Sequence, residues 1–177
     1  QNQTVSINSQ PLPTATSPQN FCIQQNANLS SITITGQNIK WYDTLTNGNL
    51  LANTTLLQNE TTYFASQTIN SCESDRVPVS INIQNTPAPL VDSNQIFCAS
   101  QNPTLSSILI TGTSIKWYDT NGNNLTNTIL LQNNQTYYAT QTVNNCESSI
   151  KSTVTISLIS SLPANNYSKS FCDNLND

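Results

Sequence analysis

The sequence of 177 residues contains no histidine, and only 8% of its residues are charged. Histidine is the side chain that most often serves as a general base near pH 7 and as a metal ligand, so its absence removes the commonest catalytic arrangements. Five Lys or Arg against nine Asp or Glu give a formal net charge of -4. So few cations cannot line a phosphate-binding surface or a basic membrane patch. We therefore expect no enzyme, no cofactor and no nucleic-acid partner.

Long apolar runs are also missing. No stretch of about 18 apolar residues occurs, so we expect no direct membrane insertion. The first ten residues have neither the charged nor the apolar region of an export signal. Because the chain opens on Gln1, we interpret it as a processed chain or as a piece of a longer one. Asn, Gln, Ser and Thr supply the polarity that charged residues supply in most proteins.

What the sequence does contain is a repeat. The pair Phe21-Cys22 recurs as Phe97-Cys98, 76 residues later, and as Phe171-Cys172, a further 74 residues on. Residues 39–44 and 115–120 are both Ile-Lys-Trp-Tyr-Asp-Thr. The chain is therefore a tandem array of two complete modules with a partial module on each side.

This register predicts the domain organisation. The last strand of a preceding repeat should occupy residues 1–8, and the first residues of a following repeat should occupy 171–177. The two complete modules should span 21–84 and 97–159, and the Pro-containing connectors 9–20, 85–96 and 160–170 should be extended linkers.

Each module should be all-β. Apolar and polar residues alternate in short segments that end at turn residues, and no helical periodicity of useful length occurs. This pattern predicts a small β-sandwich for each module, in which Trp41 and Trp117 are the largest core side chains. The spacing between the second cysteine and the last strand is one residue longer in the second module. We expect a bulge between Glu147 and Thr153 to absorb that residue.

The cysteines occur once near the start and once near the last strand of each module. Metal binding would need closely spaced cysteines or a histidine nearby, so disulfides are the better interpretation. We expect one disulfide per module, Cys22–Cys72 and Cys98–Cys146, with the partner of Cys172 beyond the end of the chain. Each bridge would close a loop of roughly 50 residues, which contributes on the order of 4 kcal/mol in the chain-entropy model. Disulfides imply an oxidising, extracytoplasmic compartment.

Two other motifs are candidate sites. Residues 119–123 have the acidic and amide oxygens of a calcium loop but lack its closing Glu, so we expect an ordinary turn and no metal site. Lys40 and Lys116 recur beside the tryptophans and could form an isopeptide bond with an Asn. The alternation points both lysines away from the core, which argues against that bond.

The order of these motifs, from Phe-Cys through Ile-Lys-Trp-Tyr-Asp to Thr-Tyr-Tyr-Ala-Thr-Gln-Thr and Asn-Cys-Glu-Ser, resembles the Ig-like repeat of Bacteroidetes giant cell-surface proteins. It is similar to the repeat of gliding-motility adhesins of the SprB type. The resemblance covers both complete modules and implies that they are tandem Ig-like β-sandwich modules. It carries no catalytic residues.

The resemblance implies type IX secretion and an extracellular position at the outer membrane. It also implies a structural role, as a disulfide-stapled stalk or filament in cell adhesion and gliding motility, whose partners are neighbouring repeats of the same chain. Other parts of such a protein would contact surface glycans or the gliding and secretion machinery. Two alternatives are a weak multivalent glycan- or cell-binding module and an accessory array of a secreted polysaccharide-degrading enzyme.

Overall fold

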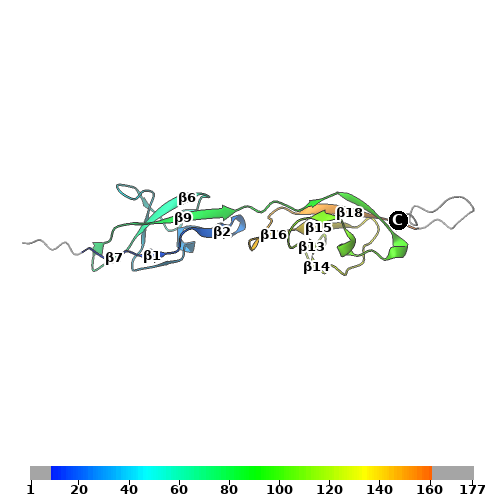
Figure 1. The fold of residues 1–177 in the computed structure, drawn as a ribbon, viewed down its shortest axis with the longest axis horizontal. Coiled ribbons are helices and arrows are strands. Elements are labelled where there is room, and N and C mark those ends of the chain that lie inside the picture. Colours follow the sequence, from blue (N-terminus) through cyan, green and yellow to red (C-terminus); the bar gives the residue numbers. More distant parts are fainter. Residues whose placement is uncertain (1–8, 161–177) are drawn as a thin grey trace, which may run out of the picture. The chain divides into compact units, whose positions relative to one another are not determined.

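A computed structural model describes residues 9–160 of the chain. They form two compact units that divide between Asn85 and Thr86. The units are called module one and module two (Figure 1). The expected repeat segments at 1–8 and 171–177, nearly all of the expected linker 160–170, and Cys172 lie outside the described residues.

Module one is built on a five-stranded sheet with the strand order β2-β9-β6-β4-β5. The first and last strands of this sheet in chain order, β2 and β9, pair in parallel, and the other neighbours pair antiparallel. Two short antiparallel pairs, β1 with β3 and β7 with β8, complete the module. The bounds are β1 Thr14–Ala15, β2 Gln19–Cys22, β3 Ile34–Thr35, β4 Lys40–Tyr42, β5 Leu50–Leu51, β6 Thr61–Ser66, β7 Thr68–Ile69, β8 Cys72–Glu73 and β9 Val77–Gln84, with 3-10 turns η1 Ile23–Gln25 and η2 Leu29–Ser31.

Module two repeats this topology, with a five-stranded sheet in the order β11-β18-β15-β13-β14. Here β11 pairs in parallel with β18, and β10 pairs with β12 and β16 with β17. The bounds are β10 Leu90–Val91, β11 Asn94–Cys98, β12 Ile110–Thr111, β13 Lys116–Tyr118, β14 Asn124–Leu125, β15 Thr136–Thr140, β16 Thr142–Val143, β17 Cys146–Glu147 and β18 Ser152–Ile159, with 3-10 turns η3 Ala99–Gln101 and η4 Leu105–Ser107. Both modules are thus all-β, as the alternation predicts.

The core of each module lies on one face of its five-stranded sheet. In β9, Val79 and Ile81 are fully buried, because alternate residues of a strand point to the same face. Trp41 from β4 is 2% exposed and packs in the same cluster. Ala27, Leu29 and Ile32, from the segment that contains η2, belong to the same cluster, and Leu29 is 1% exposed. Trp117 has the equivalent place in module two.

The segments expected to be linkers are parts of the modules. Residues 9–20 contain β1 and the start of β2, and residues 85–96 contain β10 and the start of β11. Proline lacks a donor but keeps its carbonyl acceptor, and the structure uses that acceptor. The side chain of Gln67 donates to the carbonyl of Pro11 at 2.8 Å, and that of Gln141 donates to the carbonyl of Pro87 at 2.9 Å. Both segments are therefore fixed to the module that follows them.

The extra residue of module two lies in a loop and forms no bulge in a strand. Residues 74–76 connect β8 to β9, and residues 148–151 connect β17 to β18. The strand register is the same in both modules, since Tyr63 pairs with Val79 and Tyr137 with Val154. The bulge that we expected is therefore wrong, because a loop absorbs an added residue without turning the apolar row of the strand outward.

Candidate functional site

The second cysteine of each module lies on a short hairpin. In module one the hairpin β7–β8 turns at Asn70 and Ser71, which have φ values of 49° and 65°. In module two the hairpin β16–β17 turns at Asn144 and Asn145, with φ values of 48° and 63°. Two successive residues with positive φ make the tight turn that suits a two-residue hairpin, and asparagine tolerates that conformation well. The turn places Cys72 and Cys146 at the first position of the returning strand.

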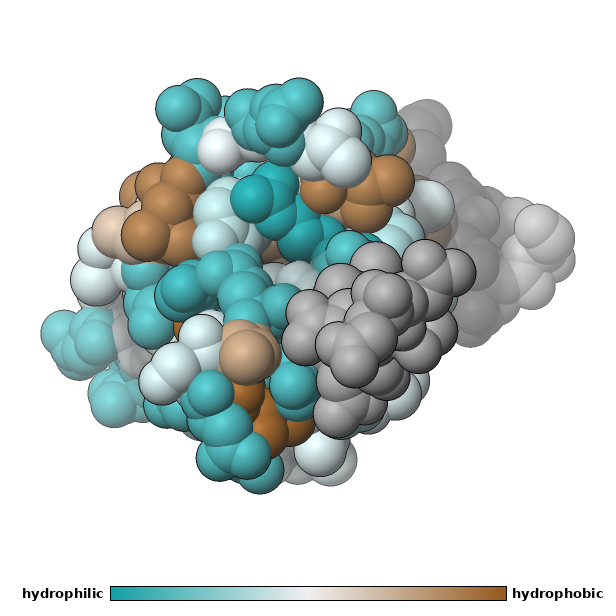
Figure 2. Space-filling view, turned by 90° about the vertical axis from the view of Figure 1, so that its left-hand side faces the viewer, coloured by the Kyte–Doolittle hydropathy of each residue, from teal (hydrophilic) through white to brown (hydrophobic). Residues whose placement is uncertain are grey.

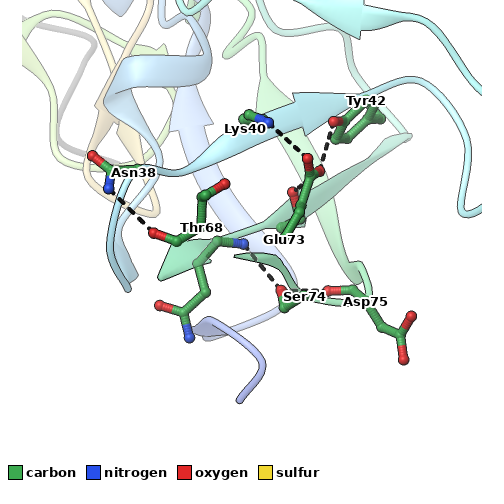
Figure 3. A network of polar contacts seen from close by, with 9 residues as sticks. Asn38, Lys40, Tyr42, Thr68, Glu73, Ser74 and Asp75 are labelled. Carbon is green, nitrogen blue, oxygen red and sulfur yellow. Dashed lines mark hydrogen bonds and ion pairs between the residues drawn. The ribbon is translucent and has the colours of Figure 1, made fainter. Parts of the chain in front are cut away.

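A carboxylate next to each cysteine fastens the hairpin to the main sheet. Glu73 accepts hydrogen bonds from the Lys40 ammonium at 2.7 Å and from the Tyr42 hydroxyl at 2.6 Å (Figure 3). It also accepts a hydrogen bond from the Ser66 hydroxyl at 2.5 Å. Lys40 and Tyr42 come from β4, and Ser66 ends β6. One side chain on β8 therefore connects the hairpin to two strands of the five-stranded sheet.

Module two repeats the arrangement around Glu147. Its carboxylate accepts hydrogen bonds from Lys116 at 2.5 Å, Tyr118 at 2.6 Å and Thr140 at 2.6 Å. Thr140 replaces the serine of module one and supplies the same hydroxyl. We call Glu73 or Glu147 with its three donors the carboxylate anchor.

Both anchor carboxylates are ionised over almost the whole pH range. Hydrogen bonds from Lys40, Ser66 and Tyr42 lower the pKa of Glu73 from 4.5 to about 2. Partial burial raises the pKa of Glu147, but the bonds from Lys116, Thr140 and Tyr118 outweigh that effect and lower it to about 2. A carboxylate with so low a pKa is a poor proton acceptor, and its oxygens are already engaged. The anchor therefore suits a structural role.

A cation lies over the anchor tyrosine in both modules. The Arg76 guanidinium is 3.3 Å from the ring centroid of Tyr42 and donates to the carbonyl of Thr44 at 2.8 Å. In module two the Lys151 ammonium is 3.9 Å from the ring centroid of Tyr118. These contacts fix the loop between the hairpin and the last strand by a cation–π interaction.

The expected bridge Cys22–Cys72 is not formed. Cys72 is exposed and has a free thiol, whereas Cys22 is disulfide-bonded. The reason is the parallel pairing of β2 with β9, which puts Cys22 beside Gln84 at the end of β9. Cys72 precedes the start of that strand, and eight residues of strand span about 23 Å. A disulfide joins Cα atoms that are about 4.4–6.8 Å apart, so the two cysteines cannot meet.

The expected bridge Cys98–Cys146 fails for the same reason. Cys98 is the register partner of Ile159 at the end of β18, and Cys146 lies on β17, before β18 begins. Cys98 and Cys146 are both disulfide-bonded. The length of β18 separates them, so each has its partner elsewhere. The cysteines of a module thus mark its two opposite ends, and we call the end that carries Cys72 or Cys146 the entry end and the other the exit end.

The calcium-like loop is a turn closed by its own amides. Asp119 Oδ1 accepts from the backbone amides of Asn121 at 2.9 Å and Asn123 at 2.8 Å, and Oδ2 accepts from the Asn123 side chain at 2.8 Å. The longer loop of module one has the same clip, in which Asp43 accepts from the backbone and side chain of Asn49. These bonds lower the pKa of both aspartates. Within residues 9–160, no group of three or more His, Cys, Asp or Glu could hold a metal ion.

The lysines considered for an isopeptide bond are members of the anchors. Lys40 pairs with Glu73 at 2.7 Å and Lys116 with Glu147 at 2.5 Å. The sequence interpretation missed both glutamates, although Cys-Glu-Ser recurs at the same register as Lys-Trp-Tyr. The signal for this ion pair was that Lys and Glu recur at equivalent positions of both copies, in a chain in which only 8% of the residues are charged.

No helix of the described part is long and apolar enough to cross a membrane. No curated protein matches the chain. Among solved structures, one described as "Crystal Structure of Rst D1-D2" is similar at 8% identity and a TM-score of 0.35, over 84% of this chain and 100% of that chain. A likeness this low supports no argument.

The model of one family matches twice, over residues 11–84 and 86–159. Each match begins at the proline-containing segment and ends with the last long strand, and only residue 85 separates the two. Together the matches cover most of the 177 residues. The chain therefore belongs to the family described as Ig-like domain, CHU_C associated, and contains two tandem copies of that domain.

Proposed function

We propose that this chain is a structural repeat segment of a long extracellular surface adhesin. It acts as a disulfide-stapled stalk in cell-surface adhesion and gliding motility, and it has no catalytic role. The observation that carries the proposal is the tandem match, two Ig-like domains of one family with a single residue between them. Repetition at such short spacing suits a spacer, because each added domain lengthens the chain by a fixed unit.

The polar groups of each module support a structural role. In both modules, the oxygens of the anchor carboxylate and of the turn aspartate accept hydrogen bonds from donors of the same module. At the end of module one that includes the β7 region, the visible apolar groups are separated by hydrophilic residues (Figure 2). A spacer needs a surface of this kind, which is polar and has few free charges.

The alternative of glycan binding has less support. A pocket in module one is lined mainly by apolar side chains, with Asn26 as its one amide side chain among Phe21, Cys22, Ile23, Ala27, Leu56, Leu57 and Ile83. A sugar site needs several convergent polar groups. We therefore propose the stalk and leave ligand binding to other parts of the protein.

Module replacement in the intact surface protein tests the proposal. The two modules are deleted in frame, and in a second strain they are replaced by two unrelated Ig-like modules of similar length. A stalk predicts that the deletion weakens attachment and gliding and that the unrelated modules restore both. If the replacement fails to restore them while surface display is normal, the native modules have a specific binding role and the proposal is wrong.

A further inference from the structure

The strand β11 of module two has an open edge. It is the outermost strand of its five-stranded sheet and pairs only with β18. In a parallel ladder, alternate residues direct both their N–H and their C=O toward the same neighbouring strand. The Ser93 carbonyl accepts from the Thr155 amide at 2.8 Å, so every second residue from Ser93 onward bonds to β18. The backbone groups of Asn94 and Ile96 therefore point away from β18.

This outward edge is exposed and has apolar neighbours. Within residues 9–160, neither Asn94 nor Ile96 has a backbone hydrogen bond to a segment other than β18. Ile96 is 60% exposed, and so is most of Leu109, at 77%. Leu109 lies at the same edge, because the Gln95 side chain accepts from its amide at 2.9 Å and donates to its carbonyl at 2.8 Å. Free backbone donors and acceptors thus lie between two exposed apolar side chains.

Module one protects the same edge. At the positions that correspond to Asn94, Ile96 and Leu109, its sequence has Pro18, Asn20 and Thr33. Proline has no N–H, and a proline on an edge strand is one way in which proteins prevent pairing with another chain. The other two positions have polar side chains in place of apolar ones. Module two lacks all three protections, and the difference points to a use for its edge.

We propose that two copies of this chain pair through the β11 edge of module two. The two β11 strands run antiparallel about a two-fold axis, with Ile96 of one copy opposite Ile96 of the other. These two residues exchange a pair of N–H···O=C hydrogen bonds, and their side chains form an apolar cross-strand pair. The pairing is an additional function beyond the proposed stalk, and it depends on module two alone.

The composition of the edge favours a second copy as the occupant. A two-fold contact brings the same surface from both sides, so each group must be compatible with its own copy. Residues 93–98 contain no charged residue and no proline. Antiparallel pairing of this segment with itself therefore brings no like charges together and lacks no donor. A single strand pair buries little surface, so the association should be weak and reversible.

Sedimentation equilibrium of the full chain tests the pairing. Cys72→Ser serves as the parent, because the exposed Cys72 thiol could otherwise link two chains covalently. Its weight-average mass should rise from the monomer value toward twice that value between about 10 μM and 1 mM. Ile96→Lys places two ammonium groups opposite each other and should lower the association constant about tenfold or more. The matched control Asn20→Lys, at the equivalent exposed position of module one, should leave it unchanged.

A second variant and a local measurement complete the test. Ile96→Asn combined with Leu109→Thr gives module two the residues that module one has at these positions, and it should also weaken association. In amide hydrogen exchange followed by NMR, the Ile96 amide should become protected as the concentration rises. The Phe97 amide, which points to β18, should be equally protected at all concentrations.

Four results would overturn the proposal. The first is a parent that remains monomeric up to about 1 mM, and the second is a species larger than a dimer, because a two-fold contact closes on itself. The third is an equal loss of association in Asn20→Lys and Ile96→Lys. The fourth is a dimer in which the Ile96 amide exchanges as fast as in the monomer, which would place the contact elsewhere.

Discussion

The hydroxyl of Ser66, a fully buried residue, donates a hydrogen bond of 2.5 Å to the Glu73 carboxylate at the surface. This bond connects the five-stranded sheet of module one to the hairpin that carries Cys72. Thr140 and Glu147 have the same relationship in module two, at 2.6 Å. The two residues depend on each other, because the buried hydroxyl has no access to water as a substitute acceptor.

Removal of the anchor carboxylate should therefore destabilise the hairpin. Glu73→Ala leaves the buried Ser66 hydroxyl without its acceptor, at a cost of about 1–3 kcal/mol. Hydrogen exchange followed by mass spectrometry should show faster exchange in residues 66–76 and unchanged exchange in module two. The control Asp75→Ala removes an exposed carboxylate from the adjacent loop. It should leave hydrogen exchange unchanged both in residues 66–76 and in module two. Equal effects of both variants would contradict the anchor.

Acid should weaken both anchors between about pH 4.5 and pH 2. The folded-state pKa of each glutamate is about 2, below the ordinary value of 4.5. As the pH falls through this window the unfolded chain binds more protons than the folded one, so the free energy of unfolding falls. The double variant Glu73→Gln, Glu147→Gln lacks these two titrations. Urea denaturation at a series of pH values should show its stability deficit at pH 7 shrinking toward pH 2, and a deficit independent of pH would contradict the prediction.

The buried amide of Gln141 should stabilise the start of module two. Its side chain accepts from the Thr113 amide at 3.0 Å and donates to the Pro87 carbonyl at 2.9 Å. Gln141→Ala leaves both backbone groups without that partner, which costs about 1–3 kcal/mol. Thermal unfolding should show a lowered midpoint, with faster hydrogen exchange between residues 110 and 116. Gln132→Ala, at an exposed position, is the control and should leave the midpoint unchanged.

Calcium should have no effect on stability. Both oxygens of Asp119 are engaged by Asn121 and Asn123, and the turn is closed without an ion. The unfolding midpoint should be the same in millimolar calcium chloride and in excess chelator. A midpoint raised by calcium, and no longer raised in Asp119→Asn, would show that the loop opens to bind the ion.

Features that depend on local alternation could be predicted from the sequence. Ile39 and Trp41 are two residues apart, so alternation puts them on the same face and predicts that Trp41 is in the core. Trp41 is buried there, and partly buried Ile39 packs against that core. The two-module organisation followed from identical motifs at fixed spacing. Such patterns depend on the order and spacing of side-chain types, which can be read directly from the sequence.

Features that depend on strand direction could not be predicted. Nothing in the four residues of β2 distinguishes a parallel partner from an antiparallel one, and that choice alone decides whether Cys22 is near Cys72 or a strand length from it. The role of Gln67 was also hidden, because its partner Pro11 lies 56 residues earlier. Contacts of this kind become visible only when the fold brings distant segments together.

The parallel pairing of β2 with β9 determines how module one responds to tension. The chain enters β2 at Gln19 and leaves β9 at Gln84, at opposite ends of the paired segment. Pulling on the two ends of the module therefore pulls β2 and β9 along their own length in opposite directions. This shears the hydrogen bonds between the strands and does not peel the strands apart one bond at a time. The evenly spaced bonds of the ladder are sheared together, and the module yields only when all of them fail at once.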